Sequence, residues 1–235
     1  MADVSKMAEE WLSEHPDAKR KKYGWPVIGN LPITGATEPN NFRIMAERKV
    51  KPEIMHLMIL SNCDHKCKLC CNKMYDIDKI PVATVEELNT VHTVCITGGE
   101  PFMSNTNIDR FAFNLKKQFP NVENVYVYTS GSAFVFNINN FGYNYLDGIN
   151  FAPKTKGDWE QLNYLSTIIH EGIRKSIYTR KSNRLYVFKE QVELFENNYK
   201  NIAKKLNLNV IYRTWDKEFK TPDNEIFRRL PIFLN

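Results

Sequence analysis

From residue 53 onward, short apolar runs alternate with segments of helical periodicity, and this alternation constrains the fold more than any other feature. A short apolar run bounded by turn signals is typical of a buried strand. Six such runs are present: Met55–Leu60, Thr93–Thr97, Val125–Thr129, Gly148–Ala152, Arg184–Phe188 and Val210–Arg213. Strands that alternate with helices indicate a parallel sheet with right-handed crossovers. About 165 residues are too few for an eight-unit barrel of about 250. The sequence therefore predicts an α/β fold, a partial (β/α)6 barrel of parallel strands.

Helices are expected between these strands. Asn107–Phe119 and Trp159–Glu171 carry apolar residues at helical spacing, and Val192–Leu206 has the pattern of a long amphipathic helix. Thr84 and Glu87 have the spacing of a capping box, which predicts that a short helix begins there.

Residues 1–50 differ from the rest of the chain. Pro and Gly punctuate Pro16–Asn41, but Trp25 and Leu31 are too apolar for a free linker. We therefore expect an N-terminal extension over residues 1–50 that packs on a main domain of residues 51–235.

Composition excludes several classes of protein. Apolar residues make up 43% and charged residues 25% of the 235 residues, which is ordinary globular composition. No stretch approaches the ~20 apolar residues of a membrane-spanning helix, and the first residues lack the apolar core of a secretory signal. A cytoplasmic protein without membrane contact is expected. The net charge of +5 permits an anionic small molecule or a nucleic acid, and the run Lys19–Lys22 is either a solvated stretch or a contact for nucleic acid.

Four of the five cysteines fall within nine residues, directly after the first predicted strand: Cys63, Cys67, Cys70 and Cys71. Such crowding without a secretion signal argues for metal or catalytic chemistry rather than disulfides. Cys63, Cys67 and Cys70 have the spacing C-x3-C-x2-C. Three thiolates bind three irons of a [4Fe–4S] cluster and leave open positions on the fourth. Cys71 is either an inert buried thiol or a further ligand, and Cys95 is expected in the core.

A structural zinc site is the alternative for these cysteines. Such a site needs four ligands, and Cys71 or His65 would have to supply the fourth. Structural zinc sites usually draw their ligands from two separated pairs, and no second pair follows here.

A second motif stands at the end of the second predicted strand: Thr97-Gly98-Gly99-Glu100-Pro101. Two glycines permit close approach of the backbone to a ligand, since they have no Cβ. Glu100 would place a carboxylate, which suits a ligand ammonium group, on the same edge of the sheet as the cysteine loop.

The C-x3-C-x2-C loop after the first strand and the GGE segment after the second together resemble the radical S-adenosylmethionine superfamily. The resemblance follows the element order over residues 53–215, but specific motifs cover only residues 61–71 and 96–103. It implies that Cys63, Cys67 and Cys70 bind a [4Fe–4S] cluster and that Gly98, Gly99 and Glu100 hold the amino group of S-adenosylmethionine. It also implies an external one-electron donor such as flavodoxin or ferredoxin. Leu69 departs from the family, which usually has an aromatic residue there.

Further candidates follow the remaining strands, because the carboxyl ends of parallel strands carry the chemistry of such barrels. Thr97, Ser130 and Asn150 are candidate cofactor contacts through hydroxyl and amide groups. Lys154 and Arg213 are candidate catalytic residues that would meet a carboxylate or phosphate. The same edge also carries Thr129, Thr155, Lys189, Trp215 and Asp216.

Two subfamilies share further short segments with the chain. TSGS at residues 129–132 and APKT at residues 152–155 resemble 7-carboxy-7-deazaguanine synthases, which implies a nucleobase- or pterin-like substrate and Mg²⁺. Ala152 replaces the serine of that second segment. The GGEPF sequence resembles glycyl-radical activating enzymes. Two other classes remain as alternatives: a zinc-stabilised nucleic-acid-binding module, and a redox protein that carries a cluster without S-adenosylmethionine chemistry. The GGE segment favours the radical enzyme, since neither alternative needs it.

Overall fold

The computed structural model of the chain describes residues 52–65, 67, 70, 72, 76–137, 145–168, 181–214 and 221–234. The predicted extension over residues 1–50, Cys71, Trp215 and Asp216 lie outside the described residues.

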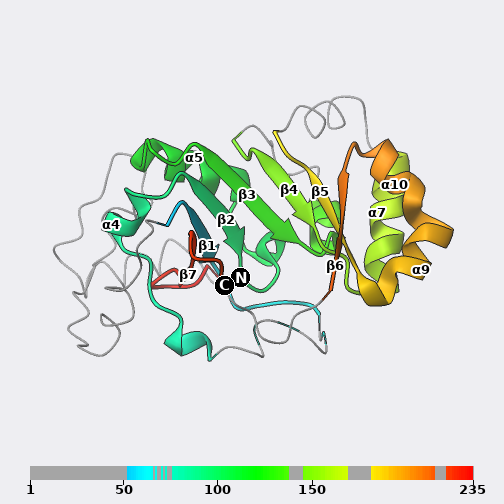
Figure 1. The fold of residues 1–235 in the computed structure, drawn as a ribbon, viewed down its shortest axis with the longest axis horizontal. Helices are drawn as coiled ribbons and strands as arrows, with labels where there is room; N and C mark the ends of the chain where they lie inside the picture. The colour runs from blue at the N-terminus through cyan, green and yellow to red at the C-terminus, as the bar shows by residue number, and fades with distance from the viewer. Residues whose placement is uncertain are drawn as a thin grey trace.

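Seven parallel strands form one sheet in the order β6-β5-β4-β3-β2-β1-β7 (Figure 1). Each pairs in parallel with its neighbours. In the described part of the chain β6 and β7 do not pair with each other, so the sheet stays open as in a partial barrel. The strands are β1 (Ile54–Met58), β2 (Thr93–Thr97), β3 (Asn124–Thr129), β4 (Gly148–Phe151), β5 (Arg184–Phe188), β6 (Asn209–Arg213) and β7 (Glu225–Arg229).

All six predicted strands are present within one or two residues, and the prediction of a parallel α/β fold is confirmed. The predicted number of strands was too low, because β7 adds a seventh beside β1. Its sequence, EIFRR, lacks the apolar run from which the other strands were predicted. Buried and half-buried positions alternate along it, and one buried position is Arg228. Arg228 is accommodated because its guanidinium donates to both carboxylate oxygens of Glu87 at 2.5–2.9 Å.

The helical segments match the predictions in part. The capping box of Thr84 and Glu87 starts helix α4, and the predicted helix over 107–119 is α5, where Asn107 caps the first turn. α7 starts three residues before its predicted position, and α6 was not predicted. The predicted helix over 192–206 is divided into α9, a π-helical segment and α10. The bounds are η2 (Ile77–Lys79), α4 (Val85–Leu88), η3 (Pro101–Met103), α5 (Ile108–Gln118), α6 (Ser132–Asn137), α7 (Lys156–Ile168), η5 (Lys189–Gln191), α9 (Val192–Leu194), η6 (Phe195–Tyr199) and α10 (Lys200–Lys205).

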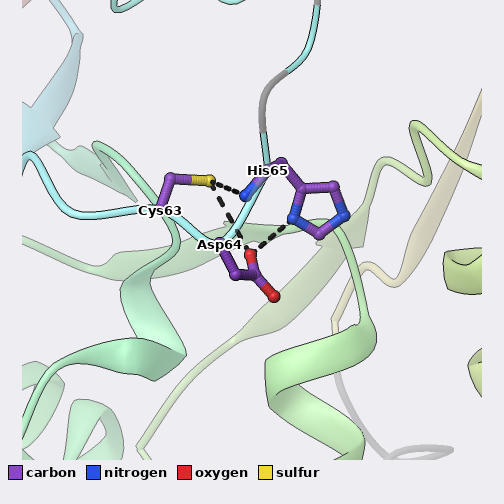
Figure 2. Close-up of side chains that lie close together, drawn as sticks. All are labelled: Cys63, Asp64 and His65. Carbon is purple, nitrogen blue, oxygen red and sulfur yellow. Dashed lines mark hydrogen bonds and ion pairs between the residues drawn. The ribbon is translucent and has the colours of Figure 1, made fainter.

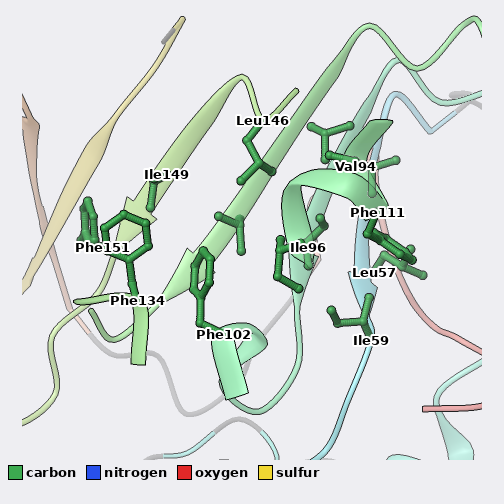
Figure 3. Packing of buried hydrophobic residues seen from close by; sticks show 14 of the residues in the cluster. Leu57, Ile59, Val94, Ile96, Phe102, Phe111, Phe134, Leu146, Ile149 and Phe151 are labelled. Carbon is green, nitrogen blue, oxygen red and sulfur yellow. The ribbon is translucent and has the colours of Figure 1, made fainter. Parts of the chain in front are cut away.

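The hydrophobic core lies between the sheet and the helices (Figure 3). Alternate strand residues point to it, as the two-residue period of a strand requires, and Phe102, Phe111 and Phe134 pack against them from η3, α5 and α6. α7 and α10 lie side by side at the β6 end of the sheet, and α4 lies at the opposite end (Figure 1). Among the described residues, no helix has the length and apolar character needed to cross a membrane.

Strand residues that point away from the core form a second, more polar face of the sheet. His56 on β1 contacts Glu225 on β7 at 2.7 Å, and the rings of Tyr128 on β3 and Tyr186 on β5 are stacked with centroids 5.9 Å apart. Because all strands are parallel, their carboxyl ends meet along one edge of the sheet. The loops after β1, β2, β3 and β4 therefore lie close together.

Candidate functional site

A pocket of about 160 Å³ lies at the carboxyl ends of β1 to β4. It is lined by Cys63, His65, Cys67, Cys70, Thr97, Gly98, Gly99, Glu100, Tyr128, Thr129, Ser130, Ala152 and Lys154. The fold thus brings the cysteine loop, the GGE segment and the turn after β3 into one cavity. Nine of the predicted site residues line it, and their individual roles remain predictions.

The three cysteines of the C-x3-C-x2-C loop all line this pocket, and none of them forms a disulfide within the described part of the chain. Cys63 is exposed, while Cys67 and Cys70 are half-buried. Burial is the largest influence on the pKa of Cys67 and raises it, against the opposing effect of the positive charges of His65 and Lys154. Three thiols around one cavity are the ligand set that a [4Fe–4S] cluster with one open iron requires. The residues present therefore fit this group.

Gly98 and Gly99 hold the cysteine loop against β2. A Cβ on Gly98, whose φ is +140°, would lie 2.3 Å from the carbonyl oxygen of Leu60, and a Cβ on Gly99 would lie 1.7 Å from that of Asn62. The backbone N–H of Gly99 donates to Leu60 O and that of Glu100 donates to Asn62 O. The sequence attributed the glycines to close approach of a ligand. In the structure, the space of both Cβ atoms is filled by the backbone that leads into the cysteine loop.

Glu100 lines the pocket, but its carboxylate is buried and already accepts four hydrogen bonds. Oε1 accepts from Thr129 Oγ1 at 2.8 Å and from the N–H of Phe102 at 3.3 Å. Oε2 accepts from the N–H and the hydroxyl of Ser130 at 2.8 and 3.0 Å. Burial raises the pKa of Glu100, and these hydrogen bonds oppose the rise. The carboxylate thus fixes the turn after β3 to the GGE segment, a role that the sequence did not predict.

His65 lies between the first two cysteines and contacts two carboxylates, of which Figure 2 shows that of Asp64. Nδ1 is 2.5 Å from Asp64 Oδ1, and Nε2 is 2.7 Å from Asp158 Oδ1. Carboxylates only accept hydrogen bonds, so both ring nitrogens donate. The bond to Asp158 is the largest cause that raises the pKa of His65 to about 11.

This arrangement bears on the zinc alternative. Cys63, Asp64 and His65 place potential ligand atoms within 4.8 Å of one another. A histidine binds zinc through an unprotonated ring nitrogen, whereas both nitrogens of His65 are occupied by carboxylates. His65 is therefore a poor fourth ligand. Cys71 lies outside the described residues.

Asn150 and Arg213 are not among the residues that line the pocket. Asn150 is buried on β4, and its Oδ1 has no hydrogen-bond partner among the described residues. Arg213 is exposed, with its guanidinium 4.4 Å from the centre of the Tyr186 ring. Lys154 lines the pocket, and its ammonium lies 3.7 Å from the centre of the Phe188 ring. No carboxylate cluster suited to Mg²⁺ is present among the described residues, so the magnesium expectation gains no support.

Three residues with contacts at the site were not predicted. Tyr128 lines the pocket, and the alternation in VYVYT could have placed it opposite the core residues Val125 and Val127. Asp158 and Ser132 contact each other at 2.6 Å beside His65. No local signal in the sequence connects Asp158 with a histidine 93 residues earlier.

Comparisons with known proteins add limited information. No protein-family model and no curated protein sequence matches the chain. The chain is similar to SuiB of Streptococcus suis bound to S-adenosylmethionine, with 13% identity over 78% of this chain and 48% of SuiB and a TM-score of 0.45. For SuiB bound to the precursor peptide SuiA, the identity is 13% over 71% of this chain and 40% of SuiB, also with a TM-score of 0.45.

BtrN in complex with AdoMet and 2-DOIA is 12% identical over 69% of this chain and 70% of BtrN, with a TM-score of 0.37. The chain spans less than half of the SuiB chains that it matches. Similarities at this level do not carry function from one protein to another.

Proposed function

We propose that this chain is a radical S-adenosylmethionine enzyme with one [4Fe–4S] cluster on Cys63, Cys67 and Cys70. One observation supports this most strongly: the three thiols and the GGE segment come from different loops and line the same pocket. Neither a zinc site nor simple electron transfer needs the thiols to share a pocket with that segment. The pocket also lies at the carboxyl ends of parallel strands, where α/β barrels carry their active sites.

When bound, the reduced cluster supplies one electron to the sulfonium of S-adenosylmethionine, which starts hydrogen abstraction from a substrate. The protein's own residues hold and orient these groups. The cysteines would ligate three irons, and the backbone of Gly98 and Gly99 would border the methionyl end of the cofactor. Glu100 fixes the hydroxyl and N–H of Ser130 at the pocket wall. An external one-electron donor such as flavodoxin or ferredoxin would reduce the cluster.

The substrate is proposed to be a small nucleobase- or pterin-like molecule with an anionic group. Tyr128 lines the pocket, and its ring stacks on that of the buried Tyr186, so one aromatic ring is available beside the space for a substrate. Lys154 also lines the pocket and supplies a cation for the anionic group, whereas Arg213 lies over the ring of Tyr186. Activation of a glycyl-radical enzyme is the second candidate, on the resemblance of GGEPF alone.

The proposal is tested by anaerobic reconstitution with iron and sulfide, followed by dithionite reduction in the presence of S-adenosylmethionine. We expect about four irons per chain, as one cubane requires, and formation of 5′-deoxyadenosine. Pterin carboxylates added to the same assay should raise the turnover if the substrate class is right. Cys67→Ala should lose both cluster and product, whereas Cys95→Ala, which changes a thiol away from the pocket, should retain both. One bound zinc and no 5′-deoxyadenosine would contradict the proposal.

A further inference from the structure

We propose that His65 and Asp158 form a clamp that holds the cysteine loop in the conformation needed to bind the cluster, with Asp158 as the positioning residue. This inference rests on the proposed function, since it concerns the same three thiols. The clamp is defined by His65 in the cysteine loop and by Asp158 near the start of α7, which approach to 2.7 Å. It connects two parts of the chain that the sheet alone does not bring into contact.

Asp158 is rigidly held before it meets the cysteine loop. Its side chain is only 1% exposed, and both of its oxygens accept hydrogen bonds. Oδ2 accepts from the backbone N–H groups of Lys154 at 2.8 Å and Thr155 at 2.9 Å. Oδ1 accepts from Ser132 Oγ at 2.6 Å and from His65 Nε2 at 2.7 Å. Buried carboxylates with several partners hold a fixed geometry, so Asp158 gives the loop a rigid anchor.

His65 connects this rigidly held carboxylate to the cysteine loop. It lies two residues after Cys63 and two before Cys67, and its backbone N–H lies 3.5 Å from Cys63 Sγ. Because its ring is bonded to Asp158, His65 fixes the backbone between two cluster ligands. The same bond keeps the backbone N–H of His65 directed at the sulfur of Cys63. Hydrogen bonds to sulfur are among the factors that set the reduction potential of iron–sulfur clusters. Loss of the clamp should change both the retention of iron and the potential.

The alternative explanation for the bonds of Asp158 is that this residue only stabilises the start of α7. Thr155 and Asp158 make the reciprocal bonds of a capping box at the start of α7, since Asp158 N–H also donates to Thr155 Oγ1. That role uses only Oδ2. The bonds of Oδ1 to His65 and Ser132 contribute nothing to the cap, and the bond to His65 is the one that reaches the cysteine loop. The two roles can therefore be separated by changing the partners of Oδ1.

The test compares His65→Ala, His65→Gln and Ser132→Ala in the full-length protein reconstituted with iron and sulfide. Glutamine retains an N–H donor for Asp158, and alanine does not. Ser132→Ala is the matched control, because it removes the other partner of Oδ1 without touching the cysteine loop. Two quantities are measured: the rate of iron loss to a chelator, and the midpoint potential of the cluster from an EPR-monitored titration. The melting temperature of the iron-free protein reports on the fold.

We expect His65→Ala to lose iron about tenfold faster than the parent, as is typical when a residue that orients a metal ligand is removed. Its potential should shift to lower values, because one N–H no longer stabilises the added electron. His65→Gln and Ser132→Ala should stay close to the parent, and all melting temperatures should be similar. Parent-like iron loss in His65→Ala, or an equal defect in His65→Gln, would overturn the inference. Failure of the parent protein to bind about four irons would instead contradict the proposed function.

Discussion

The thiols of Cys63 and Cys95 lie in opposite environments. Cys63 is exposed in the loop after β1, whereas Cys95 is 6% exposed in the middle of β2. Burial is the main reason that the pKa of Cys95 rises to about 12. The sequence predicted this difference, because Cys95 stands within a strand that was expected to be buried and Cys63 stands in a loop motif.

This difference predicts selective alkylation of the iron-free protein. The thiolate is the reactive form, and a pKa of about 12 leaves only about one Cys95 thiol in ten thousand ionised at pH 8. Iodoacetamide should therefore modify Cys63 and spare Cys95, as measured by peptide mass spectrometry. In denaturant both should react. Rapid labelling of Cys95 in the native protein would show that β2 is not buried as described.

Sequence motifs predicted most of the pocket because its residues follow strand ends. Cys63, Gly98 and Ser130 each stand directly after or near the end of a predicted strand, and parallel strands bring such positions together. The bonding of Glu100 and the pairing of His65 with Asp158 were not predictable in this way. Both depend on distances between side chains of loops that are far apart in the sequence.

Among the elements, the segment that leaves β2 has no room for side chains at Gly98 and Gly99. A Cβ on Gly99 would overlap the backbone of Ser61 and Asn62, and the parallel pairing of β1 with β2 holds the two segments in register. The strands could be predicted from their apolar runs. β7 could not be predicted in this way, because the burial of its Arg228 depends on an ion pair with Glu87 of α4. A pattern of apolar residues does not indicate an ion pair.

Gly99→Ala should therefore displace the cysteine loop. The new Cβ would lie 1.7 Å from Asn62 O, so the backbone of one segment must shift. Forced packing of this kind costs about 1–3 kcal/mol of unfolding free energy, and the reconstituted variant should bind less iron than the parent. Denaturant unfolding and iron analysis measure these two effects.

Gly157→Ala is the matched control for this variant. A Cβ at Gly157 in α7 would meet only Thr155 Oγ1, at 3.6 Å. Alanine in a helix is about 0.5–1 kcal/mol more favourable than glycine, so this variant should be as stable as the parent or more stable, with normal iron content. Equal iron content in both variants would contradict the role given to Gly99.

At the scale of the whole molecule, the open sheet brings the thiols and the GGE segment together along one edge, next to the polar face of β3 to β6. The cysteine loop is held there by two contacts of different kinds: backbone packing on Gly98 and Gly99, and the bond from His65 to Asp158. Under the proposed function, the cofactor would bind in the pocket that the thiols and the GGE segment line.

The most direct test of the central claim is pulsed ENDOR spectroscopy of the reduced, reconstituted protein with S-adenosylmethionine labelled at its amino nitrogen and carboxylate oxygens. Three cysteine ligands leave one iron open, so we predict hyperfine coupling from both labelled groups, which shows that they bind that iron. A [4Fe–4S] signal without either coupling would contradict the account and would leave a cluster that only transfers electrons.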